Sequence, residues 1–159
     1  MSDVSVPNLD PAIAFIPQPD VTTLKRIKIG EVARHFDVSV DLLRLYEREG
    51  LLIPLKSPKG TRYFTEQDYP WIATVLRLVR EAGLNFAGIR HLLALLPCWT
   101  IRECGSARQH DCSLNASADA PCWIDRKCCS PVDCYSCGVY RSACQCENLK
   151  TFVASGPAV

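Results

Sequence analysis

The amino-acid sequence predicts a mostly α-helical protein: a domain of four helices with a β-hairpin, followed by a small cysteine-rich module that is stabilised by metal. Three observations lead to this prediction. Amphipathic helical patterns, separated by capping and turn residues, run through residues 27–96. Strand-favouring residues interrupt these patterns once. All ten cysteines lie between Cys98 and Cys146, and the first 97 residues contain none.

Composition divides the chain into four segments. Residues 1–24 hold four prolines, three acids and no base, so we expect a flexible tail. Residues 25–96 form the helical domain and carry 12 bases against eight acids, which favours an anionic partner. Residues 97–150 are the cysteine-rich module, and residues 151–159 are a second flexible tail. No apolar run is long enough to cross a membrane and no secretory signal is recognisable, so we expect a cytoplasmic protein.

The first two helices are expected to be short and closely spaced. Val32 and Ala33 lie on the apolar face of the first helix, which ends in a turn at Asp37, a residue type that tolerates the backbone angles of a sharp turn. Ser39 is a favourable N-cap for the second helix, and Gly50 ends it. The sequence therefore predicts two helices joined by a tight turn.

A two-stranded hairpin is expected after this helix pair. Leu52, Ile53, Tyr63 and Phe64 favour strands. The tip of the hairpin, residues 56–62, carries three bases and no acid. The hairpin therefore presents positive charge.

Two further helices complete the predicted domain. Thr65 and Asp68 form a capping box ahead of the third helix, whose apolar stripe is expected to be Trp71, Val75, Leu78, Val79 and Ala82. Gly83 closes this helix, and Asn85 caps a fourth. The fourth helix is stopped by Pro97, and its apolar positions are Phe86, Ile89, Leu92, Leu93 and Leu96.

A helix pair followed by a basic hairpin is the arrangement of a winged helix-turn-helix, in which the second helix enters the DNA major groove and the hairpin contacts flanking phosphates. The bases expected to meet phosphates are Arg44, Arg48, Lys56, Lys59 and Arg62. The hydroxyl of Tyr46 is a further candidate donor. Two simpler interpretations stay open: Tyr46 and Tyr63 as packing aromatics, and Arg44 or Arg48 as partners of Asp41 or Glu47.

Three runs carry a resemblance to a known family. Residues 29–33 read IGEVA, residues 43–52 read LRLYEREGLL, and residues 60–64 read GTRYF. With the GLNF run at residues 83–86, they resemble in order, over about 65 residues, the N-terminal domain of MerR-family transcription regulators. Leu45 stands where the family usually has a second aromatic residue.

The resemblance implies binding to a promoter with an overlong spacer, and twisting of that DNA so that RNA polymerase engages both recognition elements. It also implies that the DNA contacts are Ser39, Arg44, Tyr46, Lys59, Arg62 and Tyr63. Family members that sense a ligand as dimers usually have a long coiled-coil helix after the fourth helix. Pro97 interrupts the helical pattern and residues 98–121 show no sustained heptad, so a homodimer would have to form without that helix.

The cysteine-rich segment contains an internal repeat. The pattern Pro-Cys-Trp, four residues and Cys begins at Pro97 and again at Pro121. A Cys-x-x-Cys pair follows at Cys134, and such a turn directs two thiolates to one point, which suits zinc or the iron of an Fe–S cluster. The candidate metal ligands are Cys98, Cys104, Cys112, Cys122, Cys128, Cys129, Cys134, Cys137, Cys144 and Cys146.

We expect bound metal because this span has few aliphatic core residues and so needs a metal to fold. An Fe–S cluster is favoured over structural zinc, because cysteines are numerous and histidines are few. A thiol–disulfide switch and binding of a toxic soft metal ion stay open as alternatives.

The sequence thus predicts a transcription regulator that recognises promoter DNA, works with RNA polymerase, and senses redox state or metal through its cysteines. The alternative is a transcription adaptor whose structural zinc module binds RNA polymerase or another protein. An enzyme is not expected, because the surroundings of His110 and Asp111 lack an oxyanion or substrate-binding signature.

Overall fold

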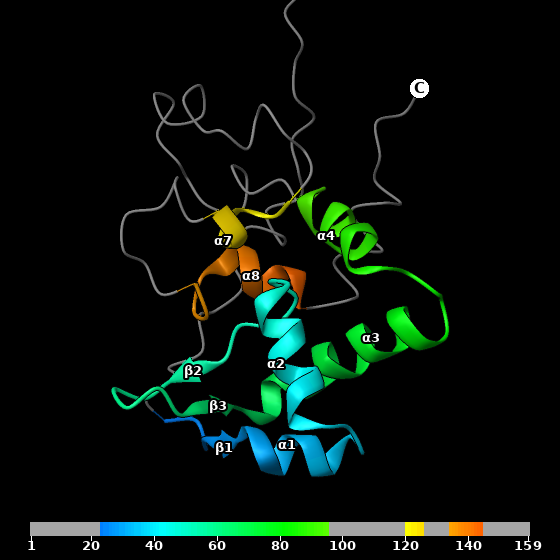
Figure 1. The fold of residues 1–159 in the computed structure, drawn as a ribbon. Helices are drawn as coiled ribbons and strands as arrows, with labels where there is room; N and C mark the ends of the chain where they lie inside the picture. The colour runs from blue at the N-terminus through cyan, green and yellow to red at the C-terminus, as the bar shows by residue number, and fades with distance from the viewer. Residues whose placement is uncertain (1–22, 96–119, 126–133, 145–159) are drawn as a thin grey trace, which may run out of the picture.

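The computed structural model describes residues 23–95, 120–125 and 134–144 (Figure 1). In these residues the chain is mostly helical with one small sheet, in agreement with the predicted class. The elements, in order, are β1 (Ile27–Lys28), α1 (Ile29–His35), α2 (Val40–Arg48), β2 (Leu55–Lys56), β3 (Arg62–Phe64), the 3-10 helix η2 (Glu66–Asp68), α3 (Tyr69–Arg80), α4 (Phe86–Ala94), α7 (Cys122–Asp125) and α8 (Gly138–Ala143). None of the described helices is long and apolar enough to span a bilayer.

The turn between α1 and α2 is built as the sequence predicts. Asp37 adopts a φ of 50°, in the left-handed region that aspartate tolerates better than most residues. The Ser39 hydroxyl accepts a hydrogen bond from the amide of Leu42 at 3.1 Å and caps α2. At the other end Gly50, with a φ of 72°, terminates the helix.

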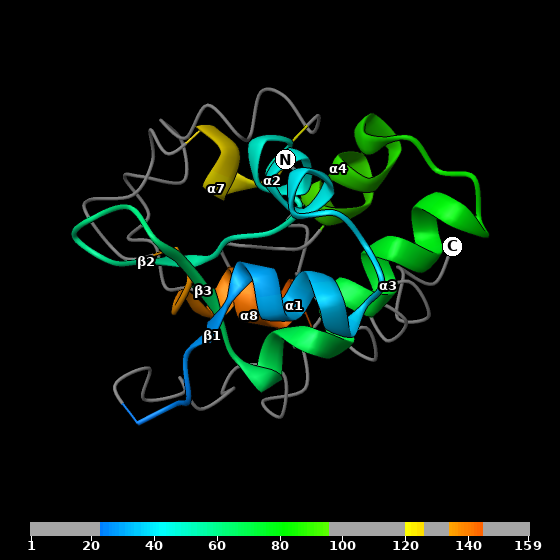
Figure 2. The ribbon, with the colours of Figure 1, turned by 60° about the horizontal axis from the view of Figure 1, so that its bottom comes forward.

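The sheet has one strand more than predicted. The order is β1-β3-β2 and both pairings are antiparallel, so β3 lies between the predicted hairpin partner β2 and the short strand β1. Figures 1 and 2 show the β2–β3 hairpin projecting from the body of the domain on the side away from α4. A two-residue strand such as β1 has too little alternation to be recognised in a sequence.

The first strand of the hairpin begins later than predicted. Leu52 and Ile53 lie before β2, because the amides of Leu51 and Leu52 donate back to the Tyr46 carbonyl at the end of α2. Pro54 has no backbone N–H to donate to a neighbouring strand. The regular pairing therefore starts at Leu55.

The predicted caps of α3 and α4 are present, but two residues of the predicted apolar stripes are exposed. The Thr65–Asp68 capping box is present, and Asn85 accepts a hydrogen bond from the amide of Gly88 at 2.8 Å. Two predicted apolar positions are wrong, because Ala82 lies beyond α3 and is exposed, and Leu92 is 40% exposed. The unpredicted buried positions of α3 are Ile72 and Leu76. Leu96 lies outside the described residues.

The described parts of the cysteine-rich segment pack into the core of the helical domain. Trp123, Val139, Tyr140 and Ala143 belong to the same buried cluster as residues of α1 to α4. The indole of Trp123 donates a hydrogen bond to the carbonyl of Gly50 at 2.8 Å. These segments therefore share one core with the domain that precedes them.

We expect Gly50→Ala to destabilise the protein more than Gly83→Ala. Both glycines have a left-handed φ, of 72° and 66°, so both variants carry a similar strain of about 1–2 kcal/mol. Only at Gly50 would a Cβ meet the docked segment, 2.5 Å from Cγ1 of Ile124. Urea unfolding should show an excess destabilisation on the order of 1 kcal/mol.

The variant Ile124→Ala supplies the control. In the Ile124→Ala background, Gly50→Ala and Gly83→Ala should lower the free energy of unfolding by the same amount. An excess that is unchanged without the Ile124 side chain would contradict the docking of α7 on the end of α2.

Candidate nucleic-acid interface

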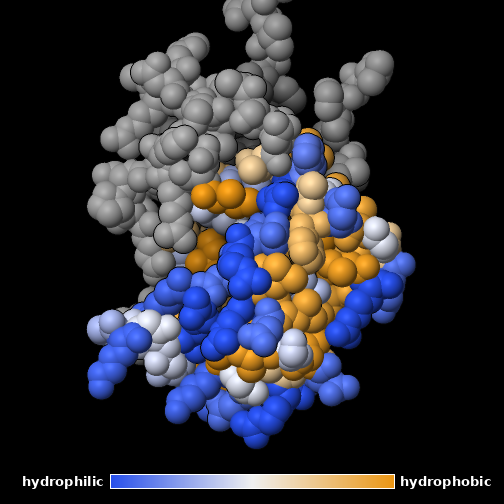
Figure 3. Space-filling model, in the orientation of Figure 1, coloured by the Kyte–Doolittle hydropathy of each residue, from blue (hydrophilic) through white to orange (hydrophobic). Residues whose placement is uncertain are grey.

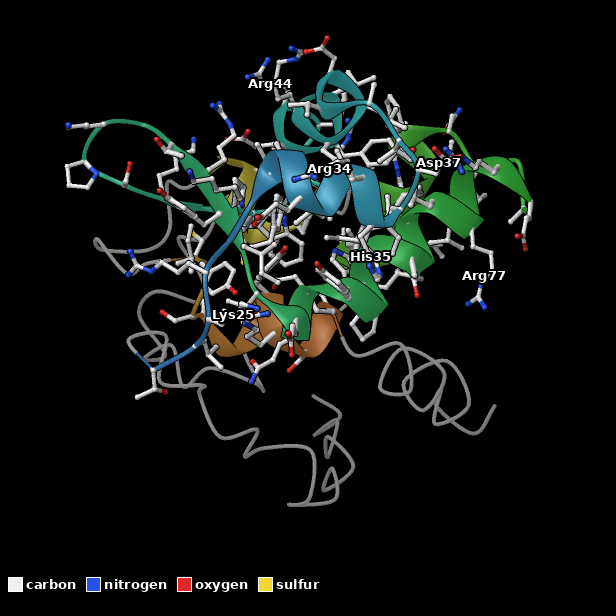
Figure 4. All side chains as sticks on the ribbon, turned by 90° about the horizontal axis from the view of Figure 1, so that it is seen from below. Lys25, Arg34, His35, Asp37, Arg44 and Arg77 are labelled. Carbon is white, nitrogen blue, oxygen red and sulfur yellow. The ribbon has the colours of Figure 1, made fainter. Side chains whose placement is uncertain are left out.

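The helix α2 buries one face and exposes bases on the other. Leu43 and Tyr46 are almost completely buried, whereas Ser39, Arg44 and Arg48 are exposed. Figure 4 shows the Arg44 side chain pointing outward from α2, on a different side of the molecule from Arg77 of α3. This face of α2 is exposed and can approach another molecule.

The guanidinium of Arg44 lies 3.2 Å from Asp41, so the open alternative of a helix-face ion pair is confirmed geometrically. The side chains are 50% and 87% exposed. An ion pair this exposed contributes about 0–1 kcal/mol, because water and salt screen it. The pair therefore does not prevent Arg44 from meeting a phosphate.

The tip of the hairpin is a well-defined turn. The Ser57 amide donates to the Thr61 carbonyl at 2.9 Å, and the Thr61 amide donates to the Ser57 hydroxyl at 3.1 Å. Gly60 has a φ of 80° within this turn. Lys59 is thereby presented, exposed, at the end of the projecting hairpin, over which Figure 3 shows hydrophilic side chains gathered.

Glu47 ties the hairpin to α2. Its carboxylate lies 2.7 Å from Nζ of Lys56 and also accepts a hydrogen bond from Nε of Arg62. Burial opposes the charge of Glu47, but the hydrogen bonds and charges of Arg62 and Lys56 outweigh it and lower the pKa of the carboxyl group. The carboxylate is therefore ionised at neutral pH, and the link holds until the pH falls through this lowered pKa.

This link changes the role expected for Arg62. The predicted phosphate contact now competes with an ion pair in which the Arg62 side chain is only 32% exposed. Lys56, at 51%, is less enclosed. The local sequence pattern offers Glu47 only the α2 arginines as partners, because its actual partners come from another element.

The structure contradicts the phosphate contact predicted for Tyr46. Its side chain is 1% exposed and packs edge-to-face on Phe86, with ring centroids 5.7 Å apart. Burial raises the pKa of its hydroxyl, an effect that Arg80 partly offsets. The packing interpretation of Tyr46 is therefore the correct one. Tyr63 is half-buried in the central strand β3, and its contact with DNA stays a prediction.

Four of the ten candidate metal ligands lie in the described residues. Cys134 and Cys137 form a turn in which the Cys137 amide donates to the Cys134 carbonyl at 3.3 Å, and Cys137 and Cys144 are the two caps of α8. Cys122 begins α7. The other six lie outside the described residues: Cys98, Cys104, Cys112, Cys128, Cys129 and Cys146. Within the described ranges no three His, Cys, Asp or Glu residues are grouped to hold a metal ion, so the metal site stays a prediction.

A buried polar cluster joins α8 to the start of α3. The Asp68 carboxylate accepts hydrogen bonds from the Tyr135 hydroxyl at 2.8 Å and from Nη1 of Arg141 at 2.9 Å. The local sequence pattern identifies Asp68 only as part of a capping box. Its partners lie 67 and 73 positions further along the chain, a separation that no local pattern reveals.

Comparisons with known proteins cover the helical domain. A family model described as MerR HTH family regulatory protein matches residues 27–96. The HTH-type transcriptional regulator AdhR of Bacillus subtilis (strain 168) is 36% identical over 64 residues, which are 40% of this chain and 45% of AdhR. The chain thus matches less than half the length of this relative. No solved structure matches the chain significantly.

Proposed function

We propose that the chain is a transcriptional regulator that binds double-stranded promoter DNA, because a family model described as MerR HTH family regulatory protein matches residues 27–96. The observation that supports this proposal best is the division of α2 into a buried apolar face and an exposed face with Ser39, Arg44 and Arg48. In helix-turn-helix proteins such a face enters the major groove.

In the proposed complex, the two basic elements contact DNA at different places. Arg44 on α2 meets the groove or its phosphates, and Lys59 at the hairpin tip meets a flanking phosphate. Arg62 and Lys56 act through Glu47 by holding the hairpin against α2. RNA polymerase as a partner, and twisting of the promoter as the means of control, are part of the same proposal.

For the cysteine-rich segment we propose a sensor of redox state or metal, built on an Fe–S cluster or another thiolate-bound metal. The Cys134–Cys137 turn supports this proposal, because it carries two thiols of the kind that such sites use. The position of the caps Cys137 and Cys144 also supports it, because ligation there would act on α8 directly. The alternative is an adaptor in which zinc has a structural role only.

We expect Arg44→Ala to weaken DNA binding and to flatten its salt dependence. Removing one phosphate contact should reduce the slope of log K against log salt by about one. Fluorescence anisotropy of a mixed-sequence duplex, titrated with the full chain at several salt concentrations, measures this slope. The matched control is Arg77→Ala, an exposed arginine that projects from α3 on another side.

The control variant should keep the wild-type slope. Equal slopes for wild type, Arg44→Ala and Arg77→Ala would contradict the assignment of α2 as the DNA-contacting element. Wild-type protein that shows no salt-dependent binding would contradict the proposed function itself.

Anaerobic purification, followed by an ultraviolet–visible spectrum and metal analysis, separates the two proposals for the cysteines. We expect iron and broad sulfur-to-iron absorption, which Cys134→Ser should diminish because it removes one thiolate of the turn. A colourless protein with stoichiometric zinc would contradict the cluster and favour the adaptor. Protein that keeps its fold under reducing conditions after chelation, with no metal recovered, would contradict both.

A further inference from the structure

The two ends of the hairpin are held by one segment of the chain. At the first end, the amide of Ile53, two residues before β2, donates a hydrogen bond to the hydroxyl of Tyr140 at 2.9 Å. At the second end, the hydroxyl of Thr65, directly after β3, lies 3.0 Å from the hydroxyl of Tyr135, and both hydroxyls donate to the Asp68 carboxylate. Residues 134–144 are therefore a common support for both ends.

Arg141 and Asp68 fix this support in one position. Nη1 of Arg141 binds Asp68 at 2.9 Å, and the guanidinium lies 4.1 Å from the centre of the Tyr135 ring, a cation–π distance. The two charged side chains are 6% and 5% exposed. A guanidinium that is paired on one side and stacked on the other allows little variation in how α8 docks.

This junction serves geometry more than stability. The buried pair loses its hydration, and such pairs are often no more stabilising than apolar residues of the same size. In addition, Nε and Nη2 of Arg141 and the hydroxyl of Ser142 are buried and have no hydrogen-bond partner among the described residues. Each such group costs about 1–3 kcal/mol. What the junction provides is a defined position of α8 relative to the hairpin.

The same segment is linked to the end of α2 through Trp123 of α7. Tyr140 packs edge-to-face on Trp123, with ring centroids 5.3 Å apart, and Trp123 donates to the carbonyl of Gly50, where α2 ends. Figures 1 and 2 show α7 beside α2. The aromatic pair therefore lies between the end of α2 and the start of the hairpin.

We propose that Tyr135, Tyr140 and Arg141 are positioning residues for DNA binding, which hold the hairpin at the distance from α2 that the duplex requires. This inference rests on the proposed function. Helix and hairpin contact phosphates at fixed separations on the DNA. A hairpin whose two ends are released, and which is then held to α2 only by the Glu47 ion pairs, loses its contact while α2 keeps its own. Because Cys134, Cys137 and Cys144 flank these residues, a change at the thiols reaches the hairpin through the same contacts.

The test is a double-mutant cycle between the support and the tip of the hairpin. Binding of a mixed-sequence duplex is measured by anisotropy for the full-length wild type, Tyr140→Phe, Lys59→Ala and the double variant. Tyr140→Phe removes the acceptor of the Ile53 amide and leaves the ring. We expect Lys59→Ala to weaken binding about fivefold in the wild type and less than about twofold in Tyr140→Phe.

Two controls make the readout specific. Arg44→Ala on α2 should weaken binding by the same factor in both backgrounds, because Arg44 does not lie on the hairpin. If Tyr140→Phe only lowered the stability of the protein, the effects of Arg44→Ala and Lys59→Ala would change together. Tyr69→Phe, which removes a hydroxyl from a ring that packs on His35 and Phe36 at the end of α1, should leave the effect of Lys59→Ala unchanged. Thermal melts establish that each variant is folded at the assay temperature, and Tyr135→Phe replaces Tyr140→Phe if the latter is not.

The outcomes are distinguishable. An equal effect of Lys59→Ala in both backgrounds would overturn the positioning role while the proposed function stands. Wild-type protein that does not bind the duplex would instead overturn the proposed function, and this inference with it.

Discussion

One buried carboxylate joins the two parts of the protein. Asp68 is buried and accepts hydrogen bonds from the amide and hydroxyl of Thr65, from Tyr135 and from Arg141. A buried charge that loses one partner of an ion pair costs about 3–5 kcal/mol, so these donors have to be present together. Asp68, which belongs to the capping box ahead of α3, is therefore also the residue on which the docking of α8 depends.

Three arginines show how burial assigns different roles to one residue type. Arg141 is enclosed and fixes α8 on Asp68. Arg62 is about one-third exposed and holds the hairpin to Glu47. Arg44 is half exposed and is restrained only by a screened surface pair. The strength of an ion pair falls as water gains access to it. A buried arginine therefore holds elements of the fold together, whereas an exposed arginine is available to a phosphate.

The parts of the fold that the sequence predicted are those encoded within a few residues. The cap at Ser39, the turn at Asp37 and the box that ends at Asp68 join atoms no more than five positions apart. The sequence predicted the bases of α2 and the hairpin as candidate DNA contacts. It did not predict that Lys56 and Arg62 form ion pairs with Glu47. The bond from Ile53 to Tyr140 spans 87 positions, and only the folded chain brings these residues together.

The most direct test of the central claim, that residues 134–144 dock on the helical domain, is amide hydrogen exchange at Ile53 in the full-length protein. Its amide donates to Tyr140, whereas the amide of Leu51 donates to the carbonyl of Tyr46 within the helical domain. If α8 is docked, Ile53 exchanges as slowly as Leu51, through global unfolding. Rapid exchange at Ile53 beside a protected Leu51 would contradict the docking.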